Sequence, residues 1–187
     1  AAAALVGRRV VAVTVRNPQL RRPVDIEALK SSCVGREIRG FRRRGKYLLA
    51  DFGGECGVLL HLGMSGRFHL LESETPLDPH EHVVWMLDDG REWRFHDPRR
   101  FGLVVPIHLP ADGTDPPDLA SLGPEPLDSA WSGPTLHCEL RKTRRAVKLA
   151  LLDQSVVAGL GNIYVCEALF EAGISPKRAA YRIGRAR

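Results

Sequence analysis

The sequence has 187 residues, of which 44% are hydrophobic and 26% are charged, and its formal net charge is +5 with a pI of about 9.3. This composition excludes a disordered chain, and no apolar run reaches the length of a membrane span. The basic balance favours a polyanionic partner such as DNA or RNA, although many basic proteins bind no nucleic acid.

The four cysteines, Cys33, Cys56, Cys138 and Cys166, are scattered, and no two of them have zinc-ligand spacing. Scattered cysteines are typical of a reducing cytosol rather than of a disulfide scaffold. We therefore expect a cytoplasmic protein without a metal site in this sequence. Because the first residue is Ala1 rather than methionine, we also expect the natural chain to begin elsewhere.

Short strands with turns between them are predicted for the first half of the sequence. A β-branched run over residues 10–15 is followed by the turn signal Asn17-Pro18, and a short helix is predicted from Ile26 to Gly35. Two hairpins are predicted, one from residues 47–52 and 58–62, and one from residues 82–87 and 92–95. This pattern predicts a β-sandwich or barrel over residues 1–106.

The character of the sequence changes after Pro106. Residues 107–134 are rich in proline, glycine and aspartate and are interpreted as a linker. Apolar residues at helical spacing then predict three helices, Thr135–Lys142, Arg144–Asp153 and Asn162–Ala172, the last of them closed by Gly173. The expected fold class is α+β, with a β-sandwich domain followed by a helical domain over residues 135–187.

Two segments of the first half stand out as candidates for chemistry. The run Arg-Arg-Arg-Gly-Lys-Tyr-Leu-Leu at 42–49 is either a solvated cationic edge or a place where Lys46 is held at the start of a rigid strand. The run His-Leu-Gly-Met-Ser-Gly at 61–66 predicts a tight turn with Met64 at its tip. Met64 is then either core filler or an exposed wedge that enters a base stack.

Two further segments carry polar groups suited to a nucleic acid. In His-Asp-Pro-Arg-Arg-Phe-Gly at 96–102, two arginines beside an aromatic ring suit phosphate contact and stacking; the alternative is a salt bridge from Asp97 to an arginine over a buried Phe101. Residues 151–164 predict two helices joined by a glycine-bearing loop. Asn162 at the second helix start is either a plain N-cap or also a phosphate ligand.

These four segments, together with Leu-Gly-Pro-Glu-Pro-Leu at 122–127, resemble the formamidopyrimidine-DNA glycosylase family, in order and over nearly the whole sequence. The sister group, endonuclease VIII, shares the fold and its helix–two-turns–helix element. It does not usually combine the Gly-Met-Ser-Gly turn with the Asp-Pro-Arg-Arg-Phe-Gly loop, so we prefer the purine-repair branch. A ribosomal or topoisomerase protein with a helix–two-turns–helix is a third interpretation, which the β-rich half disfavours.

The resemblance implies roles for particular residues. It makes Lys46 a catalytic-pocket lysine and 135–187 a helix–two-turns–helix DNA-binding domain, incomplete at its C-terminus. Residues Met64, Arg99 and Phe101 fill the gap left by an extruded base and wedge the opposite strand. The implied DNA-binding residues are His80, Arg99, Arg100, Arg144, Lys148 and Asn162, with His82 as a close competitor for the place of His80.

The resemblance also implies a reaction. Family members remove oxidised purines such as 8-oxoguanine and formamidopyrimidines from duplex DNA by base flipping, and an amino-terminal proline then forms a Schiff base with the sugar. The proline segment and a four-cysteine zinc finger are not among residues 1–187, so we expect both to be missing and no cofactor in this chain. The expected partner is damaged or abasic duplex DNA, bound by a monomer in the cytoplasm or nucleoid. The alternative is a non-catalytic remnant that binds damaged DNA.

Overall fold

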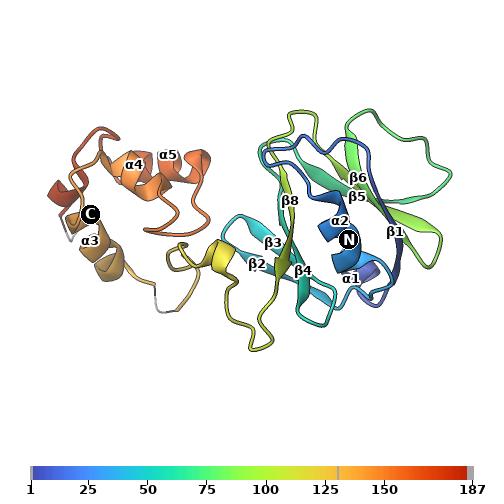
Figure 1. Ribbon diagram of the computed structural model, residues 1–187. Helices are drawn as coiled ribbons and strands as arrows, with labels where there is room; N and C mark the ends of the chain where they lie inside the picture. The colour runs from blue at the N-terminus through green and yellow to red at the C-terminus, as the bar shows by residue number, and fades with distance from the viewer. Residues whose placement is uncertain (1, 130, 185–187) are drawn as a thin grey trace. The chain divides into compact units, whose positions relative to one another are not determined.

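The computed structural model describes residues 2–129 and 131–184, and these divide into two compact units, Ala1–Pro116 and Pro117–Arg187 (Figure 1). The first unit contains, in chain order, α1 (Ala2–Leu5), β1 (Val10–Val15), α2 (Ile26–Cys33), β2 (Gly40–Arg44), β3 (Tyr47–Asp51), β4 (Cys56–His61), β5 (Arg67–Glu72), β6 (Glu81–Leu87), β7 (Arg91–His96) and β8 (Leu103–His108). The second contains η1 (Pro117–Leu119), α3 (Gly133–Arg141), α4 (Val147–Leu152), α5 (Asn162–Glu171) and η2 (Ala180–Arg182). The predicted α+β class is confirmed.

Within its described residues, the first unit consists of two four-stranded antiparallel sheets, ordered β1-β6-β7-β5 and β2-β3-β4-β8. The predicted strand over 10–15 and both predicted hairpins are confirmed. Strands β2, β5 and β8 were not predicted. Strand β2 contains Gly40 and three consecutive arginines and so has no alternating apolar pattern, and β8, although rich in valine and isoleucine, contains Pro106, which disfavours a strand.

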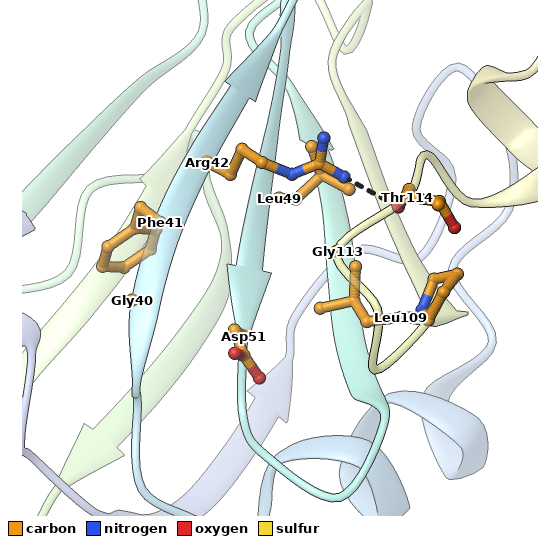
Figure 2. A pocket seen from close by; sticks show the side chains of 9 residues that line it. Gly40, Phe41, Arg42, Leu49, Asp51, Leu109, Gly113 and Thr114 are labelled. Atoms are coloured by element: carbon orange, nitrogen blue, oxygen red, sulfur yellow. Dashed lines mark hydrogen bonds between the residues drawn. The ribbon is translucent and has the colours of Figure 1, made fainter.

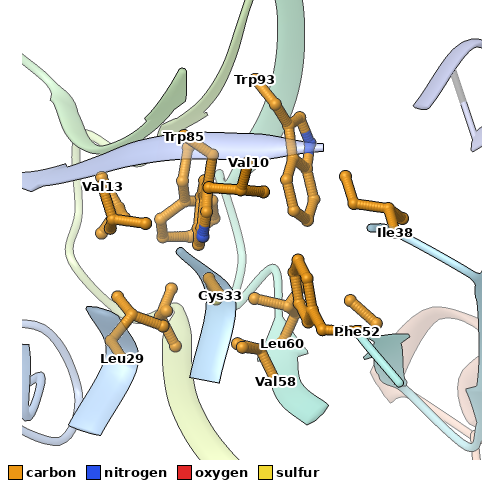
Figure 3. Packing of buried hydrophobic residues seen from close by; sticks show 14 of the residues in the cluster. Val10, Val13, Leu29, Cys33, Ile38, Phe52, Val58, Leu60, Trp85 and Trp93 are labelled. Atoms are coloured by element: carbon orange, nitrogen blue, oxygen red, sulfur yellow. The ribbon is translucent and has the colours of Figure 1, made fainter. Parts of the chain in front are cut away.

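The two sheets face each other across one apolar core, which confirms the predicted sandwich. Trp85 and Trp93 of the first sheet lie with their ring centroids 4.5 Å apart and face residues such as Leu60 of the second (Figure 3). Helix α2 packs against β1, β4 and β8 and adds Cys33 to this core. Burial raises the pKa of the Cys33 thiol to about 12, so this cysteine is a packing residue.

The opposite face of strand β7 carries a buried charged network. Arg94 has no exposed surface, and its guanidinium contacts Glu81 at 3.0 Å and Glu92 at 2.7 Å. It also donates to the carbonyl oxygens of Thr75 (2.7 Å) and Pro76 (3.4 Å), which belong to the segment between β5 and β6. A charge that is removed from water in this way is stable only while its partners are present.

The segment interpreted as a linker, residues 107–134, is divided between the two units. Its first two residues belong to β8. Further along, Asp115 contacts both Arg42 and Arg44 of strand β2 at 2.7 Å. Arg42 also reaches the Thr114 carbonyl at 3.2 Å, beside an open cavity of about 320 Å³ (Figure 2). The unit boundary lies between Pro116 and Pro117, inside the predicted linker.

The second unit has its own core, to which α3, α4 and α5 all contribute. The helix predicted over 144–153 is wrong at its start, because α4 begins at Val147. Its N-cap, Ala146, has non-helical φ and ψ angles of −55° and 138° and forms a bridge with Ala179. The Val147 amide donates to the Arg178 carbonyl at 2.7 Å rather than to a preceding turn. Arg144 therefore precedes the helix in which it was placed.

Candidate nucleic-acid interface

Strand register brings separate loops of the first unit to one end of the sandwich. Tyr47 pairs with His61, and His61 pairs with Leu103, so the start of β3, the end of β4 and the start of β8 lie side by side. In the other sheet the end of β7 pairs with the start of β5. The turn containing Lys46, the turn over 62–66 and the loop over 97–102 consequently meet at this end.

Met64 lies at the tip of its turn and is 72% exposed, so the interpretation of it as core filler is wrong. The turn is closed by the Gly66 amide, which donates to the Leu62 carbonyl at 2.8 Å. Gly63 has a φ of 64°, and a Cβ there would lie 2.6 Å from the Phe101 carbonyl carbon. A glycine is therefore required for this turn to pack against the loop over 97–102.

Asp97 joins the two loops. It is fully buried, and its carboxylate accepts hydrogen bonds from the Ser65 hydroxyl (2.8 Å) and from the Gly102 amide (2.7 Å). A longer bond comes from the Arg99 amide at 3.3 Å. Phe101 is 46% exposed, so the alternative interpretation, a salt bridge from Asp97 over a buried phenylalanine, is wrong. Asp97 organises backbone and hydroxyl donors and leaves the arginine side chains available.

The three residues predicted to act as a wedge are brought together. The Arg99 guanidinium lies over the Phe101 ring at 4.8 Å, while Arg100 adopts a left-handed φ of 57° between them. Phe101 and Met64 line one pocket of about 380 Å³. The arrangement exposes an arginine–aromatic stack and a flexible thioether on a loop pair that Asp97 holds in place.

The structure separates the two histidines that compete for one role. His82 is 3% exposed, and its Nε2 lies 2.8 Å from the Asp97 carbonyl oxygen, so it supports the arginine loop from inside. His80 is exposed, and its carbonyl accepts from the Asp97 amide at 2.9 Å. Its side chain is therefore the one at the surface, and DNA contact by His80 stays a prediction.

Lys46 lies with Gly45 in the two-residue turn between β2 and β3, not inside a strand. Partial burial lowers the pKa of its ammonium group from the usual range. The role predicted for Lys46 is untested, but its position is at the same end of the sandwich as Met64.

His61 was missed by sequence reasoning. Its Nδ1 accepts the Gly63 amide proton at 2.8 Å, so the neutral ring carries its own proton on Nε2. Burial, followed by the charges of Arg21 and Lys46, lowers the pKa of His61 and favours this neutral form. The sequence gives no sign that His61 accepts a hydrogen bond from the Gly63 amide, because that bond depends on the conformation of the turn that follows the strand.

In the second unit, Lys148 and Asn162 are brought together through a cysteine. The Lys148 ammonium lies 3.3 Å from the Cys166 sulfur, which in turn lies 3.8 Å from the Asn162 side-chain oxygen. The expectation that Asn162 caps α5 is wrong: Gly161 is the N-cap, and Asn162 is the exposed first residue of the helix. Arg144 is exposed but lies outside α4.

The loop between α4 and α5 is closed by side chains. The Gln154 amide nitrogen donates to the carbonyls of Leu152 (3.0 Å) and Leu160 (2.9 Å), and its oxygen accepts from the Gly159 amide (2.9 Å). Asp153 accepts from the Ser155 hydroxyl and amide and contacts Arg145 at 2.7 Å. These bonds fix the N-terminal end of α5, where Asn162 lies.

We expect a pH dependence from Asp153. The Ser155 hydroxyl, then Arg145, lowers the pKa of Asp153 from 3.8 to about 2 in the folded chain. The stabilisation is therefore complete above the unfolded pKa and is lost as pH falls from about 4 towards 2. Urea midpoints followed by circular dichroism between about pH 5 and pH 2 should fall less steeply for Asp153→Asn than for the parent. Ser155→Ala should give an intermediate slope, and parallel curves for all three chains would contradict this assignment.

Across residues 2–129 and 131–184, no group of three or more histidine, cysteine or acidic side chains is placed to hold a metal ion. No helix in this part of the chain is long and apolar enough to cross a membrane.

Comparison with known sequences matches both units. Residues 1–104 match the formamidopyrimidine-DNA glycosylase N-terminal domain, and residues 122–187 match the H2TH domain of the same glycosylases. A formamidopyrimidine-DNA glycosylase of Magnetococcus marinus is 47% identical over 184 residues, which are 98% of this chain and 66% of the relative. One of Halorhodospira halophila is 50% identical over 186 residues, 98% of this chain and 67% of the relative. The chain thus spans about two-thirds of the length of these relatives.

Solved structures give the same match. A Lactococcus lactis formamidopyrimidine-DNA glycosylase bound non-covalently to DNA with an AP site has a TM-score of 0.86 at 28% identity, covering 99% of this chain and 70% of that one. A complex of the same enzyme with FAPY-dG-containing DNA has a TM-score of 0.84 at 29% identity, covering 97% of this chain and 68% of that one.

Proposed function

Because this chain belongs to the formamidopyrimidine-DNA glycosylase family, we propose that it serves base-excision repair as a DNA glycosylase and AP lyase for oxidised purines in duplex DNA. The substrates are 8-oxoguanine and ring-opened formamidopyrimidines, and abasic sites are bound as well. Support comes from the similar structures, which hold DNA with an AP site or with FAPY-dG. The relatives are bacterial, and we place the protein in the cytoplasm at the nucleoid.

The observation that carries this proposal is the exposed cluster of Met64, Arg99 and Phe101 on loops joined by buried Asp97. A glycosylase must extrude its target nucleotide, because the atom that reacts is inaccessible inside the stack. Unstacking costs a few kcal/mol per step, and an apolar wedge that occupies the gap offsets part of this cost. An exposed thioether and an exposed aromatic ring beside an arginine suit this task.

Phosphate contacts complete the proposal. Arg100 and His80 in the first unit, and Arg144, Lys148 and Asn162 in the second, are the side chains that we assign to the DNA backbone. Such contacts position the duplex but do not identify the lesion. Lys46, with its lowered pKa, is assigned to proton transfer or phosphate contact at the flipped nucleotide. No metal chemistry is assigned to the described residues.

The test of the proposed function is the salt dependence of binding. We expect the chain to bind a fluorescent duplex that contains a tetrahydrofuran abasic analogue, measured by anisotropy between about 50 and 200 mM salt. The logarithm of affinity should fall linearly with the logarithm of salt, by about 0.9 for each phosphate neutralised. An affinity that does not change with salt, or the absence of binding at the lowest salt, would contradict the proposal.

A further inference from the structure

The segment between β1 and α2 is a rigid loop that the proposed function has not used. The Gln19 amide donates to the Asn17 side chain at 2.9 Å, and the Val24 amide donates to the Pro18 carbonyl at 2.9 Å. Leu20 and Val24 are buried in the core of the first unit. The residues between these two anchors are therefore held in place by backbone bonds and packing rather than by their own side chains.

Arg21 lies between the buried residues Leu20 and Val24, and its backbone is hydrogen-bonded to the loop that carries Phe101. Its amide donates to the Gly102 carbonyl at 3.2 Å, directly after Phe101. Its exposed side chain lines the pocket of about 380 Å³ with His61, Met64 and Phe101. Within the described part of the chain its guanidinium has no hydrogen-bond or ion-pair partner, whereas each guanidinium nitrogen of Arg94 has at least one.

We propose that Arg21 binds a DNA backbone phosphate beside the wedge residues Met64 and Phe101. The planar guanidinium offers several donors in a geometry that suits phosphate oxygens. A second group of the same pocket, His61, is a neutral donor through its Nε2. No acidic residue lines this pocket, so an anion entering it meets a cation and no repulsion.

This inference rests on the proposed function, and one titration distinguishes a failure of the inference from a failure of the proposed function. The probe is the duplex with a tetrahydrofuran abasic analogue, titrated with the full chain over the same salt range. Arg21→Gln should weaken binding by about tenfold at low salt, the effect of one charged hydrogen-bonding contact. It should also reduce the salt slope by about 0.9, the effect of one phosphate. Arg21→Lys should keep most of the slope, because a point charge still neutralises the phosphate.

Arg22→Gln is the matched control, since Arg22 is the adjacent exposed arginine and does not line the pocket. Its slope should stay near that of the parent. Equal slope changes in Arg21→Gln and Arg22→Gln would overturn the site, as would an unchanged slope in Arg21→Gln. A loss of affinity without a change of slope would instead indicate a base contact and also overturn the proposal.

If the parent chain does not bind the duplex, the proposed function fails first. Thermal unfolding should match the parent, because the Arg21 side chain holds no part of the fold.

Discussion

Replacing Arg94 by methionine is expected to destabilise the first unit by about 3–5 kcal/mol, the usual cost of breaking a buried ion pair from one side. Methionine fills much of the same volume, but the buried Glu81 and the mostly buried Glu92 then lose their positive partner. Two carbonyls of the segment between β5 and β6 lose a donor at the same time. Urea unfolding followed by the fluorescence of the core tryptophans Trp85 and Trp93 measures the loss.

The matched control is Arg91→Met on the same strand. Arg91 contacts Asp89 at 2.6 Å, but both side chains are partly exposed, so solvent screens this pair and its loss should cost far less stability than the loss of Arg94. A double variant, Arg94→Met with Glu81→Gln, should recover part of the stability, because one uncompensated buried charge is then removed. If Arg94→Met costs no more than Arg91→Met, the buried network does not stabilise the sheet as described.

The largest functional effect is expected at the wedge. Met64→Ala, Arg99→Ala and Phe101→Ala should each weaken binding to the abasic duplex more than binding to undamaged duplex, with Phe101→Ala losing about tenfold or more in preference. The reason is that a wedge gains contacts only where the stack is opened, and stacking on an aromatic ring contributes about 1–3 kcal/mol per base. Anisotropy titrations with the two duplexes at one salt concentration measure the ratio.

Two controls isolate this effect. Lys148→Ala should weaken binding to both duplexes about equally, because a phosphate contact carries no information about the lesion. Met86→Ala removes the other methionine of the sequence, which lies on β6 and is 40% exposed, and should leave both affinities unchanged. The wedge assignment would be falsified if the Met64, Arg99, Phe101 and Lys148 variants lost the two affinities in parallel.

Much of this protein follows from local sequence. The β-branched run over residues 10–15 predicts β1, and turn residues between short apolar runs predict both hairpins, because these residue types favour strands and tight turns respectively. The tight turn with Met64 at its tip follows from the flanking glycines Gly63 and Gly66, although the exposure of Met64 was decided only by the fold. Helix α5 follows from apolar residues at helical spacing closed by Gly173. The family resemblance follows from the order of the motifs, and the comparisons confirm it.

Other features were decided by tertiary structure. Sequence alone left His80 and His82 as competitors for one DNA-contacting role. The fold distinguishes them, because His82 is buried against the Asp97 carbonyl. Sequence alone also left Asp97 as an ion-pair candidate, whereas the fold surrounds it with amide donors. Local pattern indicates which face of an element is buried, but not which segment covers that face. The partners of Arg94, the tautomer of His61 and the exposure of Arg21 all depend on segments distant in the sequence, so only the folded chain determines them.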